Sequence, residues 1–415
     1  METNVLELKS PEAVSQDLLM EILRNGAQNM LAAAIEAEAA EYVARYQDLR
    51  DEHGRRLVVR NGHKPKREII TGVGPVEVRQ PRVNDRRVDE NGERMRFTSK
   101  IIPPYLRRVK NVEDLIPWLY LKGISTSDFS EFLEKLTGVK TASLSPTTVV
   151  RLKEIWKAEY ADWARRSLAD KRYAYIWVDG VHFNIRLEGE RQCVLVVIGA
   201  LADGTKELVA IQDGIREDEQ SWTELLLDLK ARGLSDDPEL AIGDGALGFW
   251  AAKEKILPNT RSQRCWVHKT ANVLSKLPKS VQPRAKDQIH DVWMADSRQE
   301  AEKALALFEQ KYGAKYPKAV ECLTKDEEEL LAFYDFPAEH WKHLRTTNPI
   351  ESTFATLRLR TKRTKGSGSR VACLTMVFKL AQSAEKHWRK LNGHQLLGDV
   401  INGVVFKDGI RVEAA

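Results

Sequence analysis

The sequence predicts an α/β fold in which a mixed sheet is flanked by helices. Three apolar runs of extended character follow one another with short turns between them, at 173–178, 182–187 and 193–201. A helical stretch, a short buried strand and a second helix come next, at 218–232, 240–243 and 245–257. Antiparallel strands followed by helix, parallel strand and helix are the element order of a ribonuclease-H-like core.

Turn signals and order define this sheet further. Asp179-Gly180 and the segment 188–190 are expected to be its turns, and 208–213 is expected to continue the sheet. In the predicted order, the first strand and the strand at 240–243 can lie side by side. Asp179 and Asp244 would then meet although 65 residues separate them.

The region before the core is predicted to be mainly helical. Residues 1–52 form an N-terminal helical region, because apolar residues recur at helical spacing across 11–50. Residues 53–110 form a basic, β-rich segment, with short strands and glycine turns across 54–83.

Residues 111–170 are predicted to contain three helices, at about 112–122, 128–137 and 147–163. Two short helices before a third favour a helix-turn-helix-like DNA-binding region, with an ordinary helical bundle as the alternative. The expected reading residues lie on the third helix: Thr147, Thr148 and Arg151.

The core is expected to occupy 171–269 and to be completed by 341–395, with a C-terminal tail at 396–415. Between the two parts lies an all-α insertion at 270–340. Its predicted helices are 282–293, 297–312 and 316–333.

Composition excludes several classes of protein. The chain has 415 residues with 42% hydrophobic and 30% charged residues, as expected for a globular protein of two or three domains. No apolar run approaches the roughly 20 residues of a membrane span, and the N-terminus lacks a signal-peptide pattern. The cysteines are few and scattered, which favours a reducing compartment. We therefore expect a soluble intracellular protein without a membrane partner.

Charge is distributed unevenly along the chain. Residues 52–110 carry 16 Lys/Arg against 7 Asp/Glu, and residues 342–372 carry 8 against one acid, Glu351. A single basic segment is usually a solvated face. Two of them, one containing a candidate carboxylate, indicate a polyanionic partner such as DNA.

Three acidic residues at element ends are the candidate catalytic and metal-binding groups: Asp179, Asp244 and Glu351. Converging carboxylates are what a pair of Mg²⁺ ions needs for in-line attack on a phosphodiester. Each acid also has a purely structural interpretation. Asp179 could form a hairpin turn, Asp244 could cap a helix, and Glu351 could belong to a capping box that begins at Asn348.

Two further sets of residues lie near these acids. Arg358 follows Glu351 by seven residues and so shares its helix face, where it could hold a phosphate. The basic run continues with Arg360, Lys362, Arg363 and Lys365. Cys265 and His268 form a Cys-x-x-His pair, but no second ligand pair is near, which favours core packing or an active-site edge over zinc.

The combination of motifs resembles the Mutator-type transposases of bacterial insertion sequences, over roughly residues 20–395. The motifs are Trp177-Val-Asp-Gly-Val-His182, Gly243-Asp-Gly245, Arg264-Cys-Trp-Val-His-Lys269 and Thr347-Asn-Pro-Ile-Glu-Ser-Thr353. The resemblance implies that Asp179, Asp244 and Glu351 are the Asp-Asp-Glu triad. It also implies that Cys265 and His268 are the family signature, that Arg358 is the basic residue after the catalytic Glu, and that the insertion is helical.

The resemblance implies an Mg²⁺-dependent transposase, with Mn²⁺ as a substitute. Its partners would be double-stranded terminal inverted repeats and target DNA, and it would act as a homodimer or higher oligomer in the bacterial cytoplasm, at the nucleoid when bound. Two alternatives remain: a domesticated sequence-specific DNA-binding regulator, and a ribonuclease-H-like nuclease without strand transfer.

Overall fold

The computed structural model describes most of the chain, and it divides into two compact units, Met1–Val149 and Val150–Ala415. The described residues are 11–90, 92–104, 106, 119, 131–132, 146–185, 191–214, 216–354 and 369–412. Each unit is described by itself below.

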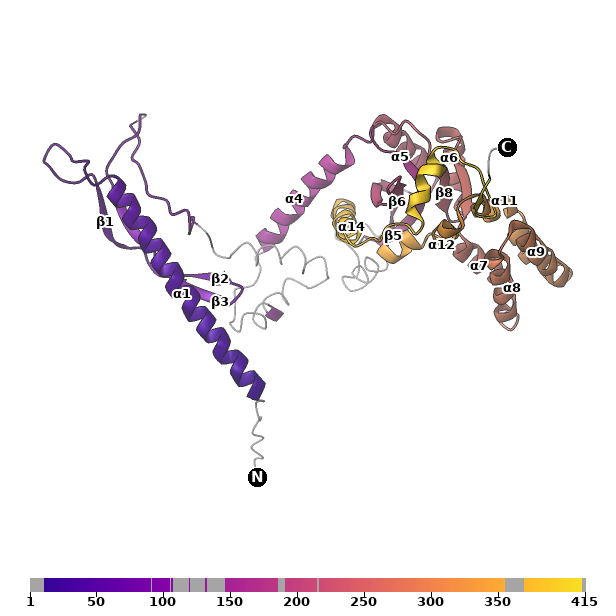
Figure 1. Cartoon of the computed structure of the whole chain (residues 1–415), viewed down its shortest axis with the longest axis horizontal. Helices are drawn as coiled ribbons and strands as arrows, with labels where there is room; N and C mark the ends of the chain where they lie inside the picture. Colours follow the sequence, from indigo (N-terminus) through magenta and orange to yellow (C-terminus); the bar gives the residue numbers. More distant parts are fainter. Residues whose placement is uncertain are drawn as a thin grey trace, which may run out of the picture. The chain divides into compact units, whose positions relative to one another are not determined.

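The first unit combines one long helix with two small antiparallel sheets (Figure 1). Helix α1 is Pro11–Arg45. Strand β1 (Val58–His63) pairs with β4 (Pro81–Asp85), and β2 (Arg67–Thr71) pairs with β3 (Gly74–Val78). A small apolar core joins helix and strands: Ile35, Ile69, Val76, Val78 and Ile102. The predicted helix and strands of this region are confirmed, with the helix ending five residues early.

Several arginines of the basic segment have structural partners within this unit. Arg87 pairs with the buried Asp85 at 2.7 Å, and its guanidinium lies 3.5 Å from the ring centre of Tyr46. Arg60 pairs with Glu36 of α1 at 2.8 Å. The net charge of the segment is therefore larger than the charge it presents to solvent.

Only part of the predicted helix-turn-helix falls within the described residues. Helix α4 (Pro146–Ala164) confirms the third helix. The predicted helices at 112–122 and 128–137 lie almost wholly outside the described residues. The reading role of this region therefore stays a prediction.

The second unit is built on a five-stranded mixed sheet in the order β7-β6-β5-β8-β9. The strands are β5 (Tyr173–Asn184), β6 (Arg191–Leu201), β7 (Lys206–Gly214), β8 (Leu240–Gly243) and β9 (Arg261–Arg264). β5, β6 and β7 pair antiparallel, whereas β8 runs parallel to both β5 and β9. The predicted mixed sheet and its helices are confirmed.

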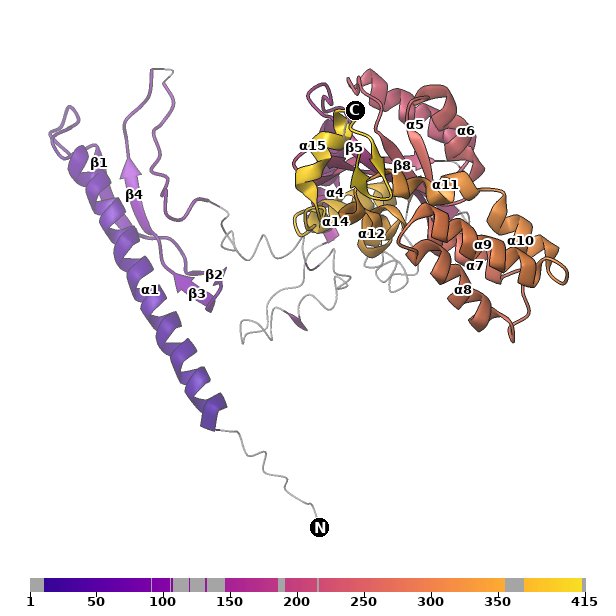
Figure 2. The ribbon, with the colours of Figure 1, turned by 45° about the vertical axis from the view of Figure 1, so that its right-hand side comes forward.

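Successive side chains of β5 point to opposite faces of the sheet and so contribute to two layers of the core. Ile176 and Val178 face α5 (Glu219–Ala231) and α6 (Leu247–Ile256), whose buried residues include Trp222. Tyr175 and Trp177 face the other way, toward the segment that contains His340 and His343. Helix α14 (Arg370–Glu385) lies away from α5 and α6 in both ribbon views (Figures 1 and 2).

One predicted turn is wrong. Asp179-Gly180 does not reverse the chain, because β5 continues through both residues to Asn184. The ladder to β6 is unbroken there, with Asp179 opposite Val196 and Gly180 opposite Leu195. Pairing along a long buried strand outweighs the local turn preference. The second predicted turn, 188–190, lies outside the described residues.

The segment after the sheet is helical, as predicted. Its helices are α7 (Trp266–Leu274), α8 (Gln282–Met294), α9 (Arg298–Tyr312), α10 (Pro317–Thr324) and α11 (Glu327–Leu331), followed by η1 (Ala332–Asp335). The predicted single helix at 316–333 is wrong in its continuity, because Asp326 has a non-helical backbone. At this break Asp326 pairs with the ammonium of buried Lys269, which also donates to the Cys322 carbonyl at 2.9 Å.

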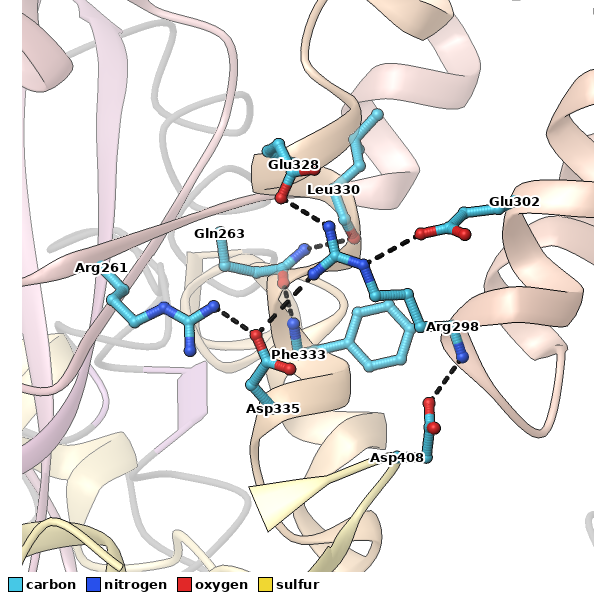
Figure 3. Close-up of polar contacts among 9 residues, drawn as sticks. All are labelled: Arg261, Gln263, Arg298, Glu302, Glu328, Leu330, Phe333, Asp335 and Asp408. Carbon is cyan, nitrogen blue, oxygen red and sulfur yellow. Dashed lines mark hydrogen bonds and ion pairs between the residues drawn. The ribbon is translucent and has the colours of Figure 1, made fainter. Parts of the chain in front are cut away.

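A polar network fastens this helical segment to the edge strand β9 (Figure 3). The amide of buried Gln263 donates to the Leu330 carbonyl at 3.1 Å and accepts from the Phe333 nitrogen at 2.8 Å. Arg298 pairs with Glu328 at 2.5 Å, and its backbone nitrogen donates to Asp408 at 2.7 Å. The position of β9 is thereby fixed from outside the sheet.

None of the described helices combines the length and apolar character that crossing a bilayer requires.

Candidate active site

Strands β5, β8 and β9 run parallel, and their registers bring three candidate residues to one level: Asp179 within β5, and Asp244 and Cys265 directly after the ends of β8 and β9. Trp177 is in register with Ile242, so the residues two positions further on, Asp179 and Asp244, are neighbours. Gly243 is in register with Arg264, which places Cys265 beside Asp244. The Cys265 nitrogen donates to the Gly243 carbonyl at 2.8 Å and extends this pairing.

A third carboxylate joins the two aspartates. One oxygen each of Asp179, Glu217 and Asp244 lies within 4.8 Å of the others. Glu217 comes from the connection between β7 and α5, directly before Asp218, which caps α5 by accepting from the Ser221 nitrogen at 2.9 Å. Glu217 is not among the residues predicted from the sequence.

Glycine at position 180 makes room for Glu217. A Cβ atom on Gly180 would lie 2.5 Å from the Glu217 carboxyl carbon, which is far inside van der Waals contact. Any side chain at 180 would therefore displace the carboxylate from the two aspartates.

The electrostatics of this cluster favour a bound cation. Burial and, after it, the negative charges of the neighbouring Asp244 and Asp179 together raise the pKa of Glu217 to about 8. Oxygens that share one Mg²⁺ at ~2.1 Å lie at most about 4.2 Å apart, so the present spacing needs only slight closure. Clustered carboxylates are also the ligand type that Mg²⁺ and Mn²⁺ prefer. The three side chains fit a divalent ion.

Asp244 is held by both its side chain and its backbone. Its Oδ1 accepts from the Ala246 nitrogen at 2.8 Å. Its carbonyl accepts from Trp250 Nε1 at 2.9 Å and from the Arg264 guanidinium at 3.1 Å. The N-cap of α6 is Ala246 rather than Asp244, so the helix-capping interpretation does not apply.

Glu351 lies in a helix whose described residues are 348–354. The Thr347 carbonyl accepts the first helical hydrogen bonds, from Ile350 at 2.9 Å and from Glu351 at 3.1 Å. Thr347, not Asn348, therefore begins this helix. The Thr347 hydroxyl donates to Glu351 Oε1 at 3.1 Å and restrains the carboxylate.

The Cys-x-x-His pair connects this helix to the sheet. Cys265 is buried at the N-terminus of α7, and its sulfur accepts from the Thr347 nitrogen at 3.4 Å. His268 Nε2 lies 3.7 Å from Glu351 Oε1. The Trp266 nitrogen donates to the Arg345 carbonyl at 2.9 Å, which adds a backbone link.

Mutual contact and neighbouring groups shift the pKa values of Cys265 and His268. The contact with the Cys265 sulfur, together with the charges of Asp244 and Glu351, raises the pKa of His268 to about 9 although burial acts in the opposite direction. Burial alone would raise the pKa of the Cys265 thiol, but the contacts with His268 and Thr347 lower it on balance. His268 is therefore cationic at neutral pH and lies between acids of both groups.

The predicted acids form two adjacent groups. Among the described residues, Glu351 shares its close group with Cys265 and His268, whereas the two aspartates share theirs with Glu217. Among the residues that the structure describes, no fourth His, Cys or carboxylate lies close to all three of Cys265, His268 and Glu351. A structural zinc site needs four ligands, so the arrangement supports the active-site-edge interpretation.

Most of the predicted DNA-binding residues cannot be placed. Arg358, Arg360, Lys362, Arg363 and Lys365 lie outside the described residues, as do the side chains of Thr147 and Thr148. Arg151 is exposed on α4.

Comparison with known proteins gives a consistent result. A family model described as "Transposase, Mutator family" matches residues 1–391. The transposase for insertion sequence element IS6120 of Mycolicibacterium smegmatis is 51% identical over 302 residues, covering 73% of this chain and 93% of the relative. The transposase for insertion sequence element IST2 of Acidithiobacillus ferrooxidans is 53% identical over 287 residues, covering 68% and 95%. The transposase for ISRM5 of Rhizobium meliloti is 29% identical and covers 95% of this chain and 96% of the relative.

Proposed function

This chain belongs to the Mutator family of transposases, and from that premise we propose that it moves an insertion sequence by metal-dependent DNA cleavage and strand transfer at the carboxylate cluster. Transposases cleave DNA and join strands, and they generally use divalent metal ions. The substrates would be the terminal inverted repeats of the element and the target DNA. The observation that carries the proposal is the convergence of Asp179, Glu217 and Asp244.

The sheet supports a ribonuclease-H-like interpretation of the core. Its order, β7-β6-β5-β8-β9, has three antiparallel strands followed by two parallel ones. The acids lie where β5 and β8 run side by side, on rigid elements that fix their separation. Such a site can position reacting groups with little conformational freedom.

Asp179, Asp244 and Glu217 would hold the metal ions, and Glu351 would complete the set from the neighbouring helix. Bound Mg²⁺ would make water, and later a DNA 3′-hydroxyl, more acidic and would stabilise the leaving oxygen. His268 lies between Asp244 and Glu351 and compensates their charge. Water attack nicks the element end, and the freed 3′-hydroxyl then attacks the target strand, without a covalent protein–DNA intermediate.

Two element ends must be cut and joined in one event. This requirement implies a homodimer or higher oligomer assembled on DNA. The basic segment of the first unit would add sequence-independent phosphate contacts, and α4 would belong to the region that recognises the repeats.

One assay tests this function. Purified protein is mixed with a labelled terminal-repeat duplex, a target duplex and Mg²⁺, and the products are scored for binding, nicking and joining. Nicked and joined products are expected, with Mn²⁺ as a substitute for Mg²⁺. Binding without nicking would instead indicate a DNA-binding regulator, and nicking without joining would indicate a plain nuclease.

A further inference from the structure

A pocket of about 590 Å³ opens beside Glu351. Its walls come from three segments of the second unit: the start of β7, helix α12 (Trp341–Leu344) and the helix at 348–354. Glu351 lines the pocket, so the pocket reaches the candidate site itself. The other lining residues used below are Lys206, Lys342, His343, Asn348 and Ser352.

Two lysines face this pocket without an acidic partner. Neither Lys206 nor Lys342 forms an ion pair with any residue that the structure describes, and Lys206 Nζ donates only to the Arg389 carbonyl, at 3.2 Å. Partial burial lowers the pKa of Lys206, and the nearby ammonium of Lys342 lowers it further. Two like charges held together in a cavity are stabilised by an anion between them.

The remaining polar groups suit an anion as well. His343 Nε2 accepts from the Asn392 nitrogen at 3.2 Å, which leaves the ring proton on Nδ1. Burial and, after it, the positive charge of Lys206 together lower the pKa of His343 to about 4, so the ring is neutral at physiological pH. Asn348 is exposed and carries an amide that can donate hydrogen bonds, whereas the hydroxyl of the exposed Ser352 donates to the Pro349 carbonyl at 3.4 Å.

We propose that this pocket binds the phosphodiester backbone of the DNA strand that enters the carboxylate site, with Lys206 and Lys342 each contacting a phosphate. The proposal rests on the proposed function, because it assigns a path to the substrate of that site. Carboxylates that metal ions have not neutralised repel the phosphates of an approaching strand, and cations beside the site offset this repulsion. The pocket supplies two beside Glu351, on residues outside the carboxylate cluster.

A phosphate contact can be recognised independently of catalysis. Binding of a terminal-repeat duplex is measured in Ca²⁺ for the full-length wild type, the double variant Lys206→Gln/Lys342→Gln, and the double variant Lys206→Arg/Lys342→Arg. The exposed Lys303 of α9 serves as the matched control through Lys303→Gln. Each protein is checked by thermal denaturation, so that loss of folding is seen directly.

The glutamine pair is expected to weaken binding about tenfold and to reduce the slope of log affinity against log salt concentration by roughly 2, about 0.9 for each lost phosphate contact. The arginine pair should restore both, and Lys303→Gln should change neither. Duplexes with single methylphosphonates around the cleavage point provide the second measurement. A neutralised phosphate that weakens wild-type binding should have no further effect in the glutamine pair.

The position of that phosphate shows which DNA the pocket binds. If the phosphate whose neutralisation affects the wild type but not the glutamine pair lies on the element strand, the pocket binds the strand that is cut. If such a phosphate is found only on the target duplex, the pocket binds the target. Unchanged affinity and salt slope in a folded glutamine pair, with no coupled phosphate on either DNA, would overturn the proposal. The proposed function is judged separately, by whether the wild type nicks and joins in Mg²⁺.

Discussion

Thr347 binds the sulfur of Cys265 although 82 residues separate them in the chain, with a nitrogen–sulfur distance of 3.4 Å. The same threonine restrains Glu351 through its hydroxyl at 3.1 Å. Thr347 therefore links the sheet, through Cys265, to the helix that carries Glu351. The geometry of the site depends on this link as much as on the acids.

The first prediction concerns the acids. Asp179→Asn, Asp244→Asn and Glu351→Gln keep side-chain size but remove charge, so each should abolish nicking and joining while leaving repeat binding largely intact. The reason is that a metal pair loses a ligand. Gel assays of cleavage and binding check this. Asp291→Asn, on the exposed face of α8, should behave as wild type. Near-normal cleavage by any of the three would make that residue structural.

The second prediction concerns Gly180. Gly180→Ala should displace Glu217, because the new methyl group would meet its carboxyl carbon. Mn²⁺ affinity, measured by titration, should fall at least several-fold and cleavage should fall with it. Gly398→Ala is the matched control, since nothing lies within 4 Å of the added carbon. Equal Mn²⁺ affinity in Gly180→Ala would show that Glu217 is not a ligand.

The third prediction concerns pH. Glu217 has a pKa raised to about 8 in the folded protein, above its ordinary value of 4.5. A raised carboxyl pKa favours the neutral form, so this contribution to stability is complete below pH 4.5 and is lost as pH rises through 8. In EDTA the Tm should fall across this range. Added Mg²⁺ should raise the Tm more at pH 8.5 than at pH 6. At pH 6 the ion must first displace the proton that Glu217 carries, whereas at pH 8.5 most of the protein has already lost it.

Glu217→Gln provides the control for this pH effect. The amide cannot titrate, so the decrease of the Tm in EDTA between pH 5 and 8.5 should become clearly smaller than in the wild type. An unchanged pH profile in the glutamine variant would assign the effect to another group.

The fourth prediction concerns Thr347, which links Glu351 to Cys265. Thr347→Val removes the hydroxyl that restrains Glu351 and that also lies 3.5 Å from the Cys265 sulfur, but it keeps the shape of the side chain and the hydrogen bond from the backbone nitrogen to that sulfur. Cleavage rate should fall by roughly tenfold, while repeat affinity stays within about twofold, because a misplaced carboxylate affects the reaction more than binding. Thr324→Val removes a hydroxyl bonded only within its helix, at 3.2 Å, and should have little effect. A rate unchanged by Thr347→Val would exclude the positioning role.

The meeting of Asp179 and Asp244 follows from element order, since α5 leads from the antiparallel strands to β8, which pairs parallel beside β5. Glu217 could not be predicted in this way, because only tertiary packing turns its connection over Gly180. Strand β9 was missed because Arg-Ser-Gln-Arg has no apolar alternation; it is a strand through its parallel pairing with β8, and the side chain of Gln263 holds it from outside the sheet. The Asp-Gly turn failed because a local preference competed with a continuous ladder.

The order of the acids along the chain has a consequence for synthesis. Asp179, Glu217 and Asp244 leave the ribosome well before Glu351, and Asp408, which anchors Arg298, emerges almost last. Domains fold from the N-terminus during translation, so a nascent chain acquires its basic first unit before its cutting centre is complete. A copy shortened by a stop codon before residue 347 would keep the basic first unit but lack Glu351 and the basic run that follows it. If the proposed function holds, we expect such a product to bind element ends without cutting them and to compete with the intact protein.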